Sequence, residues 1–404
     1  MAETVRILIT AGEASGDRLG ANLITQLRRL RPDVTFEFVG VGGRQMAEQG
    51  FESLFDLSEL SVLGLFEGVM ALRRIQRRAD DIAALARQSR PDLAVLIDSW
   101  GFSLRVAQRL RKLSPKIQIV KYVGPQVWAS RPGRARTLAG AVDHLLSTQK
   151  MDAPFYAGLP LRVTFVGDPA LNRDLGEVSG ERARASLGLA KDQPVLLVLP
   201  GSRPAEIARL SEPFGEAAAR LSATTPGLAV VVPVASTVRE QVKAAVAGWS
   251  TPVILVEDDH LKYDTMAGCT AALAASGTVA TELALCGAPM VIGYRIGELS
   301  YAVLRRLMRA KFVTLFNIAA DREIAPERLQ ADCTGESLAR SLSTLFKDPG
   351  RRSAQIADQN AALKLMGRGQ GDPSERAALA ILSDLEAQKR LRPPGVSTER
   401  AQDI

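Results

Sequence analysis

Four stretches of the sequence bring small, charged or hydroxyl side chains to places where an apolar run gives way to a helix-like pattern. In the first, LPGSRPAEI (199–207), Gly201, Ser202 and Arg203 lie at the expected start of a helix. Free backbone N–H groups at a helix start, together with an arginine, form an anion-binding arrangement. No Gly-Lys-Ser/Thr follows, and GxGxxG is absent. The stretch therefore favours a phosphorylated ligand; alternatively, Arg203 is a surface residue paired with Glu206.

The second stretch, AASGTVATELAL (274–285), ends an apolar run in small residues. Ser276, Gly277 and Thr278 open the next helix, and Glu282 follows one turn later. The N–H groups of this helix start suit a second phosphate contact, and a carboxylate suits sugar hydroxyls. The alternative is a cap of the capping-box kind, although the spacing from Thr278 to Glu282 is one residue longer than that motif requires.

The third stretch is LIDSWGF (96–102), in which Asp98 ends a buried, apolar strand. A carboxylate at such a position is costly unless it has a partner or a role. Asp98 is therefore a candidate general base, or else the N-cap of the helix that follows.

The fourth stretch, TAGEASGDRLGA (10–21), is another strand-to-helix turn. Gly12 and Gly16 allow a tight turn and a close approach of a ligand to the backbone, and Ser15 suits an N-cap. Glu13 is the reserve candidate for the general base. A purely structural turn explains the stretch equally well.

The composition restricts the class of partner and the kinds of metal site that the chain can have. The chain has 404 residues, with 51 Lys plus Arg against 44 Asp plus Glu, a net charge of +7. This charge fits an acidic partner: nucleic acid, an anionic membrane or a phosphorylated substrate. The two histidines, His144 and His260, exclude a histidine-rich metal centre, and the three cysteines form no metal motif. We expect no metal and no cofactor.

Strand-like and helix-like patterns alternate almost throughout, which predicts an α/β fold with two parallel, doubly wound, Rossmann-like sheets facing a central cleft. The expected strands are 5–10, 35–40, 92–98, 117–123, 162–167, 194–199, 228–234, 252–256, 271–275 and 289–294. The expected parts are an N-terminal domain (1–170), a linker near 170–190, a ligand-binding domain (190–350), helices that pack back toward the N-terminal domain (351–390) and a disordered tail (391–404).

The ordered set of motifs resembles the lipid-A-disaccharide synthases, which are glycosyltransferases of the GT-B type. The resemblance rests on the four stretches above and on FVGVGG (38–43), LSVLGLFEGV (60–69), KYVGPQVWA (121–129), PMVIGYR (289–295) and FVTLFNIAADREIAPERLQADC (312–333). It implies transfer of 2,3-diacylglucosamine from UDP-2,3-diacylglucosamine to 2,3-diacylglucosamine 1-phosphate (lipid X). The implied products are a β-1,6-linked disaccharide and UDP, formed without a metal by inversion at the donor sugar.

The resemblance also assigns roles to residues. It implies that Arg203, the turn at Ser276 to Thr278, and Glu282 on the ribose bind UDP. The residues Asn317, Arg322 and Gln330 are implied to line the cleft. Five positions depart from the usual family pattern, and they bear on acceptor binding and on the particular acyl-sugar used: Arg44, Gly101, Gly124, Gln126 and Asp168.

One segment suggests contact with a membrane surface. LSVLGLFEGVMALRRIQRRA (60–79) is apolar and then basic. An anionic inner-membrane surface is the expected partner of a set of apolar and basic side chains: Leu63, Phe66, Met70, Arg73 and Arg74. LSYAVLRRLMRAK (299–311) is a second candidate. The alternative is a core-packed helix with a solvated basic end. Apolar runs stay well below the ~18 residues of a membrane span, so we expect a cytoplasmic, peripheral protein.

Two other functions remain open at this point. Another GT-B enzyme that uses a UDP-sugar, such as a UDP-N-acetylglucosamine epimerase, would need acid–base groups on both faces of the sugar. A catalytically inactive lipid- or RNA-binding protein would use the net charge instead, but no RNA-recognition motif is present, so we expect no nucleic-acid partner. A homodimer is compatible with the family resemblance.

Overall fold

The computed structural model describes residues 3–60, 68–113, 116–173, 175–297, 301, 308 and 310–391. The chain forms two compact units. The first is built from the residues up to Pro169 and from Gln370 onward, and the second from Ala170–Gly369.

The first unit contains a parallel sheet in the order β2-β1-β3-β4-β5-β6. Its strands are β1 (Glu3–Ala11), β2 (Val34–Val41), β3 (Leu93–Ile97), β4 (Gln118–Tyr122), β5 (His144–Ser147) and β6 (Arg162–Phe165). Every residue of β3 is buried. A continuous apolar strand of this kind is typical of a parallel sheet that helices cover on both faces.

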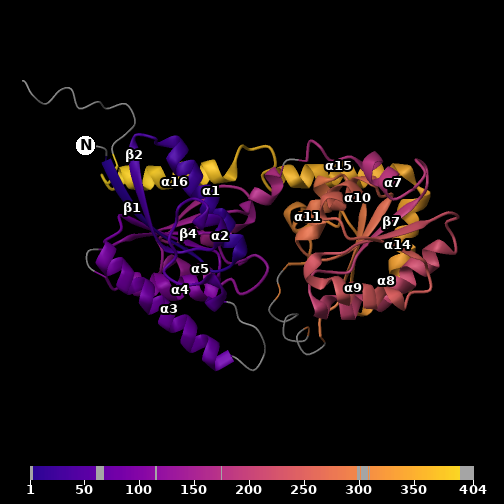
Figure 1. Cartoon of the computed structure of the whole chain (residues 1–404), viewed down its shortest axis with the longest axis horizontal. Coiled ribbons are helices and arrows are strands. Elements are labelled where there is room, and N and C mark those ends of the chain that lie inside the picture. The colour runs from indigo at the N-terminus through magenta and orange to yellow at the C-terminus, as the bar shows by residue number, and fades with distance from the viewer. Residues whose placement is uncertain are drawn as a thin grey trace, which may run out of the picture. The chain divides into compact units, whose positions relative to one another are not determined.

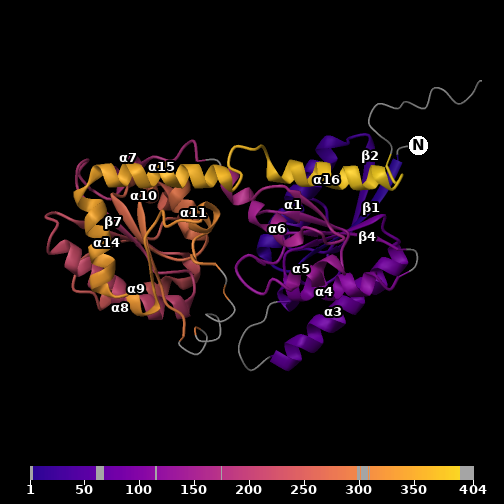
Figure 2. The same ribbon diagram turned by 180° about the vertical axis from the view of Figure 1, so that it is seen from behind.

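Alternate residues of β1 enter two different cores, because successive side chains of a strand point to opposite faces. Ile7 and Ile9 pack with α1 (Ala14–Leu30) and α16 (Pro373–Ala387). Leu8 packs with α3 (Gly68–Ser89) and α4 (Trp100–Leu110). Figures 1 and 2 show α1 and α16 on one side of this sheet, with α3 and α4 on the other. The shorter helices are α2 (Arg44–Ala47), α5 (Arg134–Ala139) and α6 (Ala153–Tyr156).

The second unit repeats this plan with the strand order β12-β11-β10-β7-β8-β9, again parallel. Its strands are β7 (Val195–Leu199), β8 (Ala229–Pro233), β9 (Val253–Val256), β10 (Ala271–Ala275), β11 (Met290–Tyr294) and β12 (Glu327–Leu329). One face is covered by α8 (Pro204–Ser222), α9 (Arg239–Ala247) and α14 (Gly335–Lys347). The other face carries α10 (Lys262–Gly268), α11 (Thr278–Leu285), α13 (Leu315–Ala320) and α15 (Pro349–Leu365), and α7 (Gly180–Ser186) packs on α10.

The predicted fold class is confirmed: the chain is α/β, with two doubly wound parallel sheets. The apolar runs predicted as strands all form strands. The prediction missed β5 and β12, because these are short and contain His144 and Glu327 instead of a continuous apolar run.

The predicted domain boundaries need three corrections. Residues 170–190 are not a free linker, because the second unit begins at Ala170 and α7 lies within it. The segment 351–390 divides: α15 remains in the second unit, where the Gln355 amide bonds the backbone of Met290, and only α16 joins the first. Leu391, placed in the predicted tail, is buried in the first core, and residues 392–404 lie outside the described part of the chain.

Candidate functional site

The strand order of each unit creates a switch point, where connections leave neighbouring strands toward opposite faces of the sheet. Ligands of open α/β sheets bind at the carboxyl ends of the strands at this point. In the first unit it lies between β1 and β3, whose ends lead into Glu13 and Asp98. In the second unit it lies between β7 and β10, whose ends lead into the turns at Gly201 and Gly277. The four sequence stretches therefore meet in two pairs, one pair in each unit.

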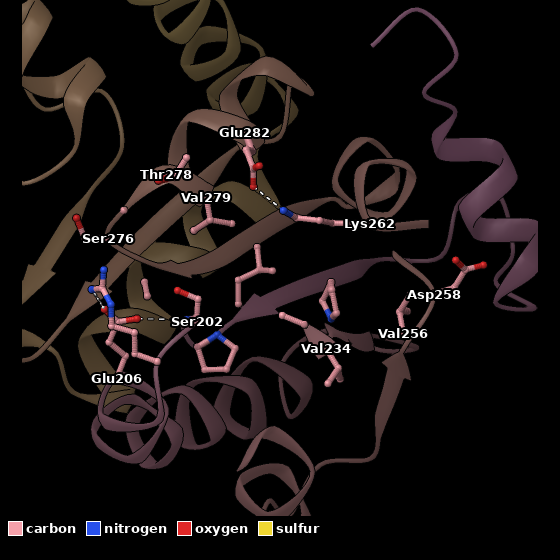
Figure 3. Close-up of a pocket in the computed structure, with 18 residues that line it drawn as sticks. Ser202, Glu206, Val234, Val256, Asp258, Lys262, Ser276, Thr278, Val279 and Glu282 are labelled. Atoms are coloured by element: carbon pink, nitrogen blue, oxygen red, sulfur yellow. Dashed lines mark hydrogen bonds and ion pairs between the residues drawn. The ribbon is translucent and has the colours of Figure 1, made fainter. Parts of the chain in front are cut away.

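The pair in the second unit lines a cavity of about 400 Å³, a size that suits a small-molecule ligand. Its walls include every residue of the two predicted binding turns: Gly201, Ser202, Arg203, Ser276, Gly277, Thr278 and Glu282. The ends of β8 and β9 and the loops that follow them complete it with Pro233, Val234, Ala235, Val256 and Asp258. Figure 3 shows Ser202 and Glu206 in one part of the pocket, and Lys262 and Glu282 in another.

One end of this pocket is a helix start. Gly201 has φ +122, a backbone conformation that side chains other than glycine rarely adopt. Arg203 is the extended N-cap of α8, and Pro204 is the first helical residue. The Arg203 guanidinium is 76% exposed and donates from Nη1 to Glu206 Oε1 at 2.8 Å. The ion pair that sequence reasoning kept as an alternative thus forms, but it forms within the pocket wall.

At the other end, Glu282 is held by three donors. Its Oε1 accepts from Arg173 Nη1 at 2.8 Å and from the Tyr263 hydroxyl at 2.9 Å. Its Oε2 accepts from Lys262 Nζ at 2.8 Å. The carboxylate is only 12% exposed, yet it borders the pocket. Because no side chain caps α11, the capping-box alternative for Glu282 is not realised.

Three residues assigned to the site by resemblance do not line this pocket. Asn317 is fully buried: its Nδ2 donates to Ala325 O and to Glu327, and its Oδ1 accepts two backbone N–H groups. It fixes the loop before β12 and has no atom left for a ligand. Arg322 forms an ion pair with Asp358 at 2.7 Å. Gln330 lies beside the backbone of Ile296 and has φ +50.

The pair in the first unit brings two carboxylates together. A hydrogen bond to Asp98, followed by partial burial and the negative charge of Asp98, raises the pKa of Glu13. Glu13 is exposed and Asp98 is half-buried. Asp98 has φ +47, and its Oδ1 accepts the N–H of Ser99. Asp98 does not cap α4, because Ser99 occupies the N-cap position.

The turn after β1 is shaped by contact with the turn after β3. A Cβ on Gly12 would lie 2.1 Å from the Cβ of Ser99, so only glycine fits there. Gly16 is buried where a Cβ would contact Ala11 at an ordinary 3.5 Å. The prediction that Ser15 caps the helix is wrong. Glu13 is the N-cap of α1, and the Ser15 hydroxyl donates to the Glu13 carboxylate at 3.0 Å.

Sequence reasoning missed Lys121, a buried lysine beneath the Asp98 turn. The residue is 2% exposed, and its ammonium donates to the backbone carbonyls of Leu96 and Asp98. Burial lowers the pKa of Lys121 to about 7, although the nearby charge of Asp98 opposes this shift. A lysine inside the apolar run IQIVKYV was the available signal.

The proposed membrane segment is only partly described. Leu63 and Phe66 lie outside the described residues, as does the Met70 side chain, although Met70 belongs to α3. Arg73 is exposed and Arg74 is half-buried, whereas Arg78 pairs with Glu59 and Asp81. No helix in the described ranges is long and apolar enough to cross a membrane. Over those ranges there is also no group of three or more His, Cys, Asp or Glu side chains that could hold a metal ion.

Comparison with known proteins identifies the family. Residues 7–381 match the family model described as lipid-A-disaccharide synthetase. The chain is 43% identical to the lipid-A-disaccharide synthase of Rhodospirillum centenum, over 93% of this chain and 94% of that one. It is 40% identical to that of Paramagnetospirillum magneticum, over 96% and 99%.

A solved structure supports the fold. The putative UDP-N-acetylglucosamine 2-epimerase from Listeria monocytogenes matches with a TM-score of 0.62 over 97% of this chain and 99% of that one. At 14% sequence identity, this likeness concerns the fold alone. The match of sequence along almost the entire length leads to one assignment: the chain is a glycosyltransferase that belongs to the lipid-A-disaccharide synthase family.

Proposed function

We propose that the chain transfers 2,3-diacylglucosamine from UDP-2,3-diacylglucosamine to the 6-hydroxyl of 2,3-diacylglucosamine 1-phosphate, forming a β-1,6-linked disaccharide 1-phosphate and UDP. The observation that carries this proposal is the pocket of the second unit. It combines a glycine turn, a helix start and an arginine with a carboxylate held by three donors. The name of the relatives indicates the product, and the pocket is the site that we propose for the donor nucleotide.

The donor's diphosphate fits the end formed by the turn after β7. The start of α8 offers backbone N–H groups, and Arg203 offers a charge that is mostly exposed and therefore able to turn toward a ligand. As the glycosidic bond breaks, negative charge grows on the departing phosphate. A helix start and an arginine stabilise this charge more in the transition state than in the bound donor.

The ribose fits the Glu282 end. Glu282 Oε1 already accepts two donors, whereas Oε2 accepts only that of Lys262 among the described residues. Oε2 thus retains a lone pair for a ribose hydroxyl. Arg173 and Lys262 hold the carboxylate in place, so the pocket binds the sugar without first rearranging.

Glu282→Gln is expected to weaken UDP binding about tenfold, because it removes a charged acceptor of the ribose hydroxyl. Calorimetry with UDP and 2′,3′-dideoxy-UDP tests this role. The loss should be confined to UDP, since the dideoxy analogue has no hydroxyl for Glu282 to accept. Asp358→Asn, which breaks another arginine–carboxylate pair of the same unit, is the control. Equal losses for both nucleotides would show that Glu282 supports the pocket without contacting the ribose.

The acceptor's hydroxyl needs a base, and the Glu13–Asp98 pair supplies one. We assign the role of general base to Asp98. Glu13 is its hydrogen-bonding partner and shares one proton with it. The raised pKa of Glu13 supports a pair in which one proton is held between two carboxylates. Lys121 donates to the Asp98 carbonyl from below, and so holds the turn in its left-handed conformation.

The acylated substrates suggest that the protein works at an anionic membrane surface, with α3 as the contact. If it does, Arg73→Glu combined with Arg77→Glu should weaken binding to anionic liposomes at least about tenfold, given about 1 kcal/mol for each basic residue near such a surface. Both arginines are exposed on α3. Arg351→Glu with Lys364→Glu, on the exposed face of α15, is the matched control. Equal liposome binding by all three proteins would contradict this contact.

A further inference from the structure

The phosphate end of the pocket already contains a carboxylate, that of Glu206. Its Oε1 accepts from Arg203 Nη1 at 2.8 Å, and its Oε2 accepts the backbone N–H of Ser202 at 3.2 Å. A Cβ on Gly201 would lie 2.8 Å from Oε2, so the carboxylate rests directly on the glycine turn. The side chain is only 11% exposed. Figure 3 shows Glu206 directed toward Ser202 in the pocket wall.

These contacts use the donors that a diphosphate needs. Carboxylate and phosphate oxygens are both anionic acceptors, and both favour an arginine and free N–H groups at a helix start. Glu206 is the third residue of α8, where a glutamate commonly reaches back to a cap. Here, however, it reaches Ser202, which precedes the N-cap, and it also occupies the arginine of the site.

A phosphate bound beside Glu206 would therefore meet a like charge. To use Arg203, the phosphate must share that guanidinium with Glu206 or displace the carboxylate. The repulsion is larger for free UDP than for a UDP-sugar, because cleavage of the glycosidic bond leaves the terminal phosphate unsubstituted and more negative. A fixed anion at this place thus weakens the product complex more than the donor complex.

We propose that Glu206 is a built-in competitor of the diphosphate for Arg203 and for the Ser202 N–H, which limits how tightly the site retains UDP. This inference rests on the proposed function, because it requires the pocket to bind the diphosphate of UDP. In this role the charge of Glu206 weakens nucleotide binding and favours product release, whereas Arg203 strengthens nucleotide binding. Loss of the Glu206 charge should improve nucleotide binding, whereas loss of Arg203 should impair it.

Calorimetry on Glu206→Gln with uridine, UMP and UDP tests the proposal. Glutamine keeps the shape and a carbonyl acceptor for the Ser202 N–H, but it leaves Arg203 without an ionic partner at this position. UDP should bind about twofold to fivefold more tightly than to the wild type, the usual worth of a partly exposed charge pair. The gain should be smaller for UMP and absent for uridine, which has no phosphate.

Three further variants make the test more specific. Glu212→Gln makes the same charge change on the exposed face of α8 and should leave UDP affinity unchanged. In an Arg203→Ala background the gain from Glu206→Gln should be smaller, since no guanidinium is left to release and only the repulsion between Glu206 and the phosphate is removed. Glu206→Ala should give the same sign for UDP, so loss of folding in one variant leaves the other as the test.

The outcomes separate this inference from the proposed function. Weaker UDP binding by folded Glu206→Gln, or an equal gain for uridine and UDP, would overturn the competitor role and leave Glu206 as a cap that shapes the turn. A wild-type protein that binds no UDP would instead refute the proposed function itself.

Discussion

Turnover is expected to fall by at least about a hundredfold when Asp98 is replaced by asparagine, which is nearly isosteric but cannot accept a proton. The acceptor's hydroxyl is a poor nucleophile until a base takes its proton during attack on the anomeric carbon. Asp98 stands at the switch point of the first unit, next to Glu13 and at the carboxyl end of β3. UDP affinity should hardly change, because the pocket proposed for the nucleotide belongs to the second unit.

The same variant should lower the pKa of Glu13. Asp98 raises that pKa through a hydrogen bond and its negative charge, and asparagine removes the charge. An NMR titration of the Glu13 carboxyl would detect the change. Near-normal turnover of Asp98→Asn would clear Asp98 and leave Glu13→Gln as the variant to examine. A collapsed melting temperature would show that Asp98 mainly maintains the strained turn.

UDP affinity is expected to fall about tenfold to a hundredfold in Arg203→Ala, since a charge-assisted hydrogen bond to phosphate is worth about 1.5–3 kcal/mol. The fold should survive, because the Arg203 side chain is mostly exposed. Calorimetry with UDP and uridine gives the readout, and only UDP should lose affinity.

Arg220→Ala is the matched control for Arg203. Arg220 also lies on α8 and also pairs with a glutamate, Glu216, but it is near the opposite end of the helix. Its removal should leave UDP binding as it is. Unchanged UDP affinity in Arg203→Ala would remove the turn after β7 from the nucleotide site, and with it the main argument for a bound diphosphate.

The fold was predictable where one element carries its own signal. Continuous apolar runs such as Val195–Leu199 are typical of strands in a covered parallel sheet, so they indicate strands without knowledge of their neighbours. β12 has no such run; its residues become a strand only because β11 offers an open edge. The sequence also did not predict that α15 belongs to the second unit, because this depends on hydrogen bonds between the Gln355 amide and the backbone of Met290.

The site was predictable to the same extent. The turn at Gly201 and the turn at Gly277 each combine strand end, glycine and helix start within a few consecutive residues, and both line the pocket. The donors that hold Glu282 come from separate segments, at Arg173 and at Lys262 with Tyr263. No local sequence pattern predicts that these segments contact one another. Asn317 lies away from this pocket, and its polar side chain binds the backbone of a buried loop, a contact that only the tertiary structure reveals.

The most direct test of the central claim is mass spectrometry of the products formed by the purified protein from UDP-2,3-diacylglucosamine and 2,3-diacylglucosamine 1-phosphate. We predict a disaccharide 1-phosphate and an equal amount of UDP, with neither formed when the acceptor is omitted. Recovery of an epimerised donor, or UDP release that does not depend on the acceptor, would contradict the assignment of this chain as the enzyme that joins the two sugars.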